Sequence, residues 1–134
     1  MKIAIMGAGG LGGYIGARLV HAGNDVTFIV RRTRLEGFHK NGLEVRSVTG
    51  TFHLPVVKAT NTPSEVGPVN LIVLGVKNYD LVAAAEEMKP MIGRSTIIVP
   101  VLNGVDHIRI MNEIVGAEHV FGGLMSMTAH VVAP

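Results

Sequence analysis

Apolar and polar positions along the chain follow two spacings, one typical of buried strands and the other of amphipathic helices. Short apolar runs predict strands at residues 2–6, 25–30, 69–74 and 96–102. Helical spacing predicts helices at residues 11–22, 34–40, 81–89 and about 106–115. Strands that alternate with helices in this way predict an α/β protein of the doubly wound Rossmann type, with a mostly parallel sheet and helices on both faces.

Turn and cap residues add detail between these elements. Thr33 with Glu36 predicts a capping box for the helix at 34–40, and Thr62-Pro63-Ser64-Glu65 predicts another. Alternating residues around Thr49-Gly50 predict a hairpin near 43–57. The stretch from Val120 to Val132 holds two pieces with strand-like composition, on either side of Gly122-Gly123.

The most informative motif lies between the first strand and the first helix. Its residues, Gly7-Ala8-Gly9-Gly10-Leu11-Gly12, fit G-x-G-x-x-G. In a dinucleotide site Gly7 permits the tight turn, Gly9 lets the backbone approach a pyrophosphate, and Gly12 allows close helix–strand packing. The alternative is a merely structural glycine-rich turn. The position between a strand and a helix, with a second strand following, favours the nucleotide interpretation.

The end of the second strand indicates which dinucleotide is bound. An acidic residue there accepts from the ribose 2′-OH of NAD, whereas an Arg accommodates the 2′-phosphate of NADP. No carboxylate lies between Asp25 and Glu36, and Arg31 stands at the expected place, followed by Arg32 and Arg34. Arg31 therefore predicts NADP (NADPH), with Arg32 and Arg34 as further cations. The alternative is that these arginines form an ordinary solvated edge.

Two later strand ends carry polar residues where ligands bind in open α/β sheets. Lys77 follows the strand at 69–74, and Asn103 follows the strand at 96–102. Lys77 can face an anion, and Asn103 can both donate and accept hydrogen bonds. The plainer alternatives are a solvent-exposed lysine and an Asn-Gly turn.

Composition sets limits on other functions. The 134 residues predict one domain, residues 1–134, with 48% hydrophobic and 16% charged residues. A formal net charge of +2 gives no support for nucleic acid or for an anionic membrane surface, and no apolar run reaches membrane-spanning length. The chain has no cysteine, and its six histidines lack helical zinc-motif spacing, so no metal site is expected. A cytoplasmic location is the default expectation.

The whole chain resembles the ketopantoate reductase (2-dehydropantoate 2-reductase) family. The resemblance rests on the glycine motif, Arg31, Val76-Lys77 and Leu102-Asn103-Gly104, in this order. The stretch from Gly122-Gly123 through Thr128 to Pro134 also resembles the family's last segment before its second, helical domain.

This resemblance implies a reductase that transfers a hydride from NADPH to the C2 ketone of 2-dehydropantoate, giving pantoate for pantothenate biosynthesis. Gly7 to Gly12 would bind the pyrophosphate, Arg31 the 2′-phosphate, and Lys77 the cofactor. Asn103 would lie between nicotinamide and substrate, and Thr128 would be a further cofactor contact. The family's general-acid lysine belongs to the C-terminal helical domain, which this chain does not contain, and its last lysine is Lys89. The chain alone is therefore expected to bind nucleotide without turnover.

Two other functions stay open at this point. One is the cofactor domain of another two-domain NADP-dependent dehydrogenase, acting on a different small acid or a sugar phosphate. The other is a stand-alone nucleotide-sensing module. For the reductase the expected partner is a small-molecule 2-oxoacid substrate, whereas the sensing module would regulate a partner without chemistry. Apolar surface left exposed around Met125 to Val132 would also favour self-association into a homo-oligomer.

Overall fold

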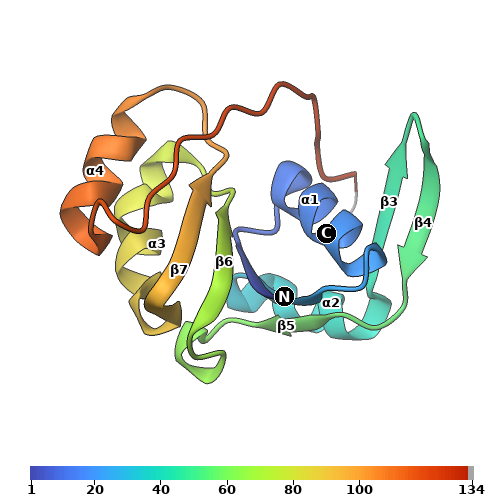
Figure 1. The fold of residues 1–134 in the computed structure, drawn as a ribbon. Coiled ribbons are helices and arrows are strands. Elements are labelled where there is room, and N and C mark those ends of the chain that lie inside the picture. Colours follow the sequence, from blue (N-terminus) through green and yellow to red (C-terminus); the bar gives the residue numbers. More distant parts are fainter. Residues whose placement is uncertain (133–134) are drawn as a thin grey trace.

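The computed structural model of the chain describes residues 1–132. Its main sheet is parallel and has the spatial order β5-β2-β1-β6-β7 (Figure 1). The strands are β1 (Lys2–Met6), β2 (Asp25–Ile29), β5 (Lys58–Thr60), β6 (Val69–Leu74) and β7 (Ile92–Pro100). Counted along the chain, these parallel strands follow the order 3-2-1-4-5 of doubly wound sheets, so the strand order reverses between β1 and β6.

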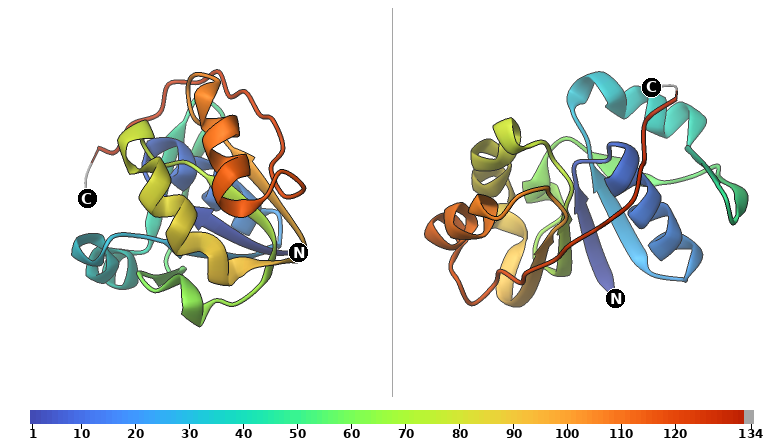
Figure 2. Two further views of the ribbon diagram at one scale, coloured as in Figure 1. Left: turned by 90° about the vertical axis from the view of Figure 1, so that its left-hand side faces the viewer. Right: turned by 90° about the horizontal axis from the view of Figure 1, so that it is seen from above.

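Helices cover both faces of this sheet, as the alternation of elements predicts (Figure 2). They are α1 (Gly10–His21), α2 (Arg32–Asn41), α3 (Leu81–Met88) and α4 (Asp106–Val115). Short 3₁₀ turns lie at Pro63–Glu65, Asn78–Asp80 and Lys89–Met91. No helix in residues 1–132 is long and apolar enough to cross a membrane.

The central strand β1 shows why both faces are covered. Ile3 and Ile5 point into the core that α1 and α2 close, whereas Ala4 and Met6 point into the core that α3 and α4 close. These β1 side chains are at most 4% exposed. Because neighbouring residues of a strand face opposite sides, a strand that is apolar throughout needs a helical layer on each side. Burying one large apolar side chain contributes about 1.5–3 kcal/mol.

The predicted hairpin is present, and a short strand that was not predicted follows it. β3 (Leu43–Ser47) pairs with β4 (Gly50–Leu54) in an antiparallel ribbon beside the main sheet (Figure 1). The turn falls at Val48-Thr49, one residue earlier than the predicted Thr49-Gly50. β5 spans only three residues. Such a segment is too short to show a period, and its pairing with β2 defines it as a strand.

Neither predicted capping box forms. α2 begins at Arg32, so Thr33 lies inside its first turn, and Arg31 is the N-cap without a side-chain cap bond. Thr62 precedes only a 3₁₀ turn and makes no cap bond. The carboxylate of Glu65, which would complete that box, instead accepts a hydrogen bond from Thr60 Oγ1 at 2.7 Å.

The prediction of two strand-like pieces between Val120 and Val132 is wrong for the described residues. Val120 forms one isolated parallel bridge with Ile98 on β7, and residues 121–132 form no strand. This segment leaves the edge of the sheet after Phe121 and crosses its upper side toward α1 (Figure 1). Strand-forming composition needs a neighbouring strand to pair with, and the segment has none along this path.

Candidate functional site

The carboxyl-terminal edge of the sheet brings the predicted site residues together. Gly7 follows β1, Arg31 follows β2, Lys77 follows β6 and Asn103 follows β7. Parallel strands all end at the same edge, so residues from distant parts of the sequence line one side of the molecule. In doubly wound sheets, this edge beside the reversal of strand order is where ligands bind.

Close packing of glycines shapes the turn between β1 and α1. Gly7 has a φ of +94°, and a Cβ there would lie 2.8 Å from Val76 Cγ1. A Cβ on Gly12 would overlap the carbonyl oxygen of Gly7. Gly75, at the end of β6, completes the contact, since its Cβ would lie 3.4 Å from Gly12 Cα. Sequence reasoning missed Gly75, although a glycine directly after a buried strand was the available signal.

Gly9 differs from these neighbours because it faces open space. A Cβ built there meets no atom within 4 Å, and the backbone is extended, with φ −74° and ψ −161°. The first hydrogen bond of α1 runs from Gly13 N to Gly9 O at 2.8 Å, and the first turn holds no acidic residue. The N–H groups at the start of the helix and the positive end of its dipole are therefore suited to a bound anion. These features fit a dinucleotide pyrophosphate.

Arg31 lies at this edge in an unexpected ion pair. Its Nη2 donates to Asp80 Oδ2 at 2.6 Å, and the side chains are 71% and 34% exposed, respectively. Sequence reasoning did not single out Asp80. It stands at the start of a helix, where an Asp is most simply a cap, so the sequence carried no signal for this partner.

Arg34 is tied to the glycine loop itself. Its Nη1 donates to the carbonyl oxygen of Ala8 at 2.8 Å, and its guanidinium lies 5.3 Å from the centre of the Phe38 ring. Predicted as a further phosphate-binding cation, Arg34 is seen here supporting the loop. Within residues 1–132, neither Arg32 nor Lys77 forms an ion pair or a side-chain hydrogen bond.

Lys77 and Asn103 lie on adjacent loops, and both are exposed. Asn78 Nδ2 donates to the backbone oxygen of Asn103 at 3.4 Å, which links the loop after β6 to the loop after β7. Asn103 also lines a shallow depression of about 610 Å³. Residues 124–128, including Thr128, line the rest of it.

The segment 121–132 starts beside the edge strand β7 and runs across the carboxyl-terminal edge of the sheet to the glycine loop (Figure 2). A Cβ on Gly10 would lie 2.7 Å from backbone atoms of Ala129. Thr128 therefore directly precedes Ala129, the residue that packs against the loop, although Thr128 does not lie on a strand. The structure thus brings Thr128 to the edge where the other predicted residues lie.

The opposite edge of the sheet has a different character. A depression of about 380 Å³ there is lined by Lys2, Asp25, Lys58 and Glu65, among others. Lys58 Nζ donates to Asp25 Oδ1 at 2.6 Å, and this hydrogen bond lowers the pKa of Asp25 below its ordinary value of 3.8. None of the predicted cofactor residues lines this depression.

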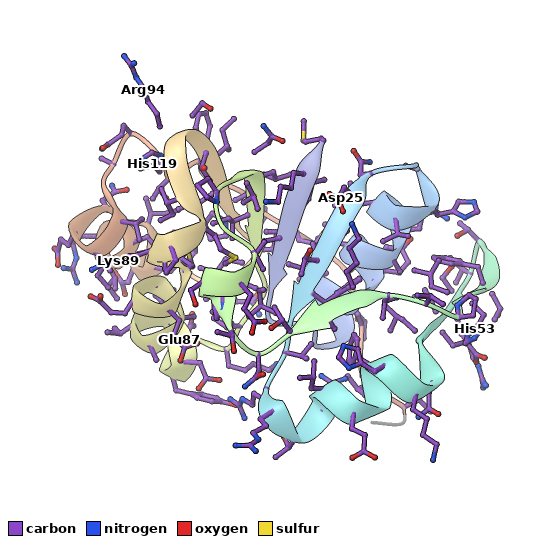
Figure 3. All side chains as sticks on the ribbon, turned by 90° about the horizontal axis from the view of Figure 1, so that it is seen from below. Asp25, His53, Glu87, Lys89, Arg94 and His119 are labelled. Atoms are coloured by element: carbon purple, nitrogen blue, oxygen red, sulfur yellow. The ribbon has the colours of Figure 1, made fainter. Side chains whose placement is uncertain are left out.

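Histidines and carboxylates do not gather anywhere in the described part of the chain. Figure 3 shows His53 and His119 on opposite sides of the molecule. Among residues 1–132, no group of three or more His, Cys, Asp or Glu side chains is placed to hold a metal ion.

The strand order and the glycine-lined turn define a Rossmann-type α/β protein. The chain belongs to the ketopantoate reductase PanE/ApbA family, whose model matches residues 3–134. It is 40% identical over 126 residues to the uncharacterized oxidoreductase YkpB of Bacillus subtilis. The matched region covers 92% of this chain and 40% of YkpB.

Solved structures agree with this assignment. The structure of 2-dehydropantoate 2-reductase from Geobacter metallireducens matches with a TM-score of 0.86 and 38% identity, over 91% of this chain and 40% of that one. The ternary structure of D-mandelate dehydrogenase with NADH and anilino(oxo)acetate matches with a TM-score of 0.90 and 28% identity, over 100% of this chain and 44% of that one. The chain spans about 40% of the length of the curated relatives it matches.

Proposed function

We propose that this chain is the NADPH-binding part of an oxidoreductase that reduces 2-dehydropantoate to pantoate. One observation carries the proposal. The glycine loop, Arg31, Lys77 and Asn103 come from different strand ends and line the same edge of a Rossmann-type sheet. Membership of the ketopantoate reductase family supports the substrate and the reaction.

Each residue at this edge has a physical task in the proposal. The start of α1, open at Gly9, binds the pyrophosphate, and Arg31 binds the 2′-phosphate through its planar guanidinium. Lys77 contacts the cofactor, with Thr128 as a further contact. The bound nicotinamide supplies the hydride for the C2 ketone. Asn103 would position the ketone of the substrate beside the nicotinamide through its carboxamide.

A second substrate is favoured by one specific observation. The D-mandelate dehydrogenase structure that matches this chain over its whole length was solved with NADH and anilino(oxo)acetate. The same cofactor fold can therefore serve a reductase of a different small 2-oxoacid. Steady-state reduction of a panel of 2-oxoacids by a full-length protein that contains this chain would distinguish the two candidates.

Titration of Arg31→Ala with both cofactors tests the cofactor assignment. The substitution should weaken NADPH binding by about 1.5–3 kcal/mol, because it removes a hydrogen-bond donor to a charged phosphate. NADH, which has no 2′-phosphate, should bind almost as before. Fluorescence of the bound reduced cofactor provides the measurement. Equal losses for NADPH and NADH would contradict the 2′-phosphate role.

A further inference from the structure

The ion pair between Arg31 and Asp80 joins two strand ends that are not neighbours. Arg31 follows β2 and Asp80 follows β6, and β1 lies between those strands in the sheet. The contact at 2.6 Å, between residues 49 apart in sequence, therefore extends across the carboxyl end of β1, where the glycine loop begins. A carboxylate is thereby held at the place where the second strand's arginine would meet a 2′-phosphate.

Asp80 adopts this position instead of capping its own helix. It is the N-cap residue of α3, with helical φ and ψ of −96° and −4°, and its side chain makes no cap hydrogen bond. An Asp at an N-cap ordinarily accepts from the backbone N–H groups of the first turn. Here the carboxylate is directed to the guanidinium of Arg31.

Sites for NAD carry an acidic residue at the end of the second strand, where it accepts from the ribose 2′-OH, and sites for NADP carry an Arg there. This chain has only the Arg at that strand end, but the fold adds a carboxylate from the end of β6. The Arg31 side chain is 71% exposed, whereas the Asp80 side chain is 34% exposed and so partly buried. A ligand can therefore reach the Arg31 guanidinium from solvent while the carboxylate stays beside it.

We propose that Asp80 is a cofactor-selectivity residue whose carboxylate narrows the preference for NADPH over NADH. The carboxylate occupies one donor of Arg31 and repels the doubly charged 2′-phosphate, whereas it can accept a hydrogen bond from a free 2′-OH. The inference rests on the proposed function, because it assumes that the dinucleotide binds at this edge. It makes Asp80 a determinant of the ratio of the two affinities.

The test compares Asp80→Asn with the unaltered chain in titrations with NADPH, NADH and the fragments adenosine 2′,5′-bisphosphate and 5′-AMP. Binding of NADPH and of the bisphosphate should tighten by about two- to fivefold, the scale of an exposed charge pair. Binding of NADH and of 5′-AMP should stay the same or weaken. The matched control is Glu87→Gln, because Glu87 is an exposed carboxylate on the same helix, about two turns further along (Figure 3). Glu87→Gln should leave unchanged both the ratio of NADPH to NADH affinity and the ratio of bisphosphate to 5′-AMP affinity.

Asp80→Ser provides a second variant without the carboxylate, in case Asp80→Asn folds poorly, because serine is a residue that helix N-caps favour. An unchanged NADPH-to-NADH ratio in a folded variant, or a weaker affinity for NADPH, would overturn the role of Asp80 while leaving the proposed function intact. Failure of the unaltered chain to bind either cofactor would overturn the proposed function, and the role of Asp80 with it.

Discussion

Gly9 and Gly12 lie three residues apart in one motif, yet their surroundings differ. The space beside Gly9 is open, whereas the backbone of Gly7 fills the space beside Gly12. The motif could be predicted from sequence because the turn and the start of the helix require glycines at this spacing. The partners of Arg31 and Arg34 could not be predicted in this way, since Asp80 and Ala8 approach them only through folding.

This difference predicts opposite outcomes for two substitutions. Gly9→Val should leave the domain folded, because its extended backbone suits a β-branched residue, but it should block dinucleotide binding by filling the space before the pyrophosphate. Gly12→Ala should destabilise the fold by about 1–3 kcal/mol or more, since a methyl group there meets backbone that cannot move aside. Thermal unfolding and NADPH fluorescence measure the two effects. Retained NADPH affinity in folded Gly9→Val would show that the loop is not the pyrophosphate site.

Among the elements, the helices, the hairpin and the strands β1, β2, β6 and β7 were predictable, whereas β5 was not and the strand-like pieces after Val120 were predicted wrongly. The bounds of β7 differ from the prediction, since this strand spans Ile92–Pro100 instead of residues 96–102. The period of apolar residues identified β6 and α4 at their observed bounds, because each element buries one or both faces. β5 and the segment 121–132 show no apolar period that would identify their structure. Three residues become a strand beside β2, and residues with strand-like composition remain unpaired where no strand is adjacent.

The edge of the sheet at β2 and β5 has a pH-dependent contact. The hydrogen bond from Lys58 lowers the pKa of Asp25 in the folded chain below 3.8. The ionised Asp25 therefore stabilises the folded chain above the ordinary carboxyl pKa. This stabilisation is lost as the pH falls through the lower pKa that Asp25 has in the folded chain. Asp25→Asn should lower the Tm slightly at neutral pH, and the difference from the unaltered chain should narrow below pH 3.8.

Thermal unfolding over a pH series would show this effect. In a Lys58→Met background the same Asp25→Asn substitution should change the Tm much less, because its partner is gone. A Tm difference that persists at the same size in that background would rule out the ion pair as its source.

At the scale of the whole molecule, the predicted site residues lie along one side of the described fold. The glycine loop, Arg31, Lys77 and Asn103 all come from a single sheet edge. Apolar side chains on the segment that crosses this edge are open to solvent, including Leu124 at 90% and Val132 at 79% exposure. The expected exposure of apolar surface near residues 125–132 is therefore present, and self-association through it stays a prediction.

We expect the 134-residue chain by itself to bind NADPH and to have no useful reductase activity on 2-dehydropantoate. Holding both reactants in register is worth up to about 7–11 kcal/mol, and one side of a cleft cannot provide it. No lysine follows Lys89 to act as the general acid that the family resemblance places in a second domain. NADPH oxidation at saturating cofactor would measure turnover. A rate within tenfold of a full-length family member would show that the acid lies within this chain.

The sequence by itself determined the alternation of strands and helices, the glycine motif and the family resemblance. Residues close together in the chain encode these features, through the period of apolar residues and through the glycines that a tight turn and a close backbone approach require. Only the tertiary structure decided that Asp80 meets Arg31, that Arg34 supports the loop, and that Ala129 packs against Gly10. Such contacts join residues far apart in the chain, and they depend on strand order and on the path of the last segment, which no local pattern specifies.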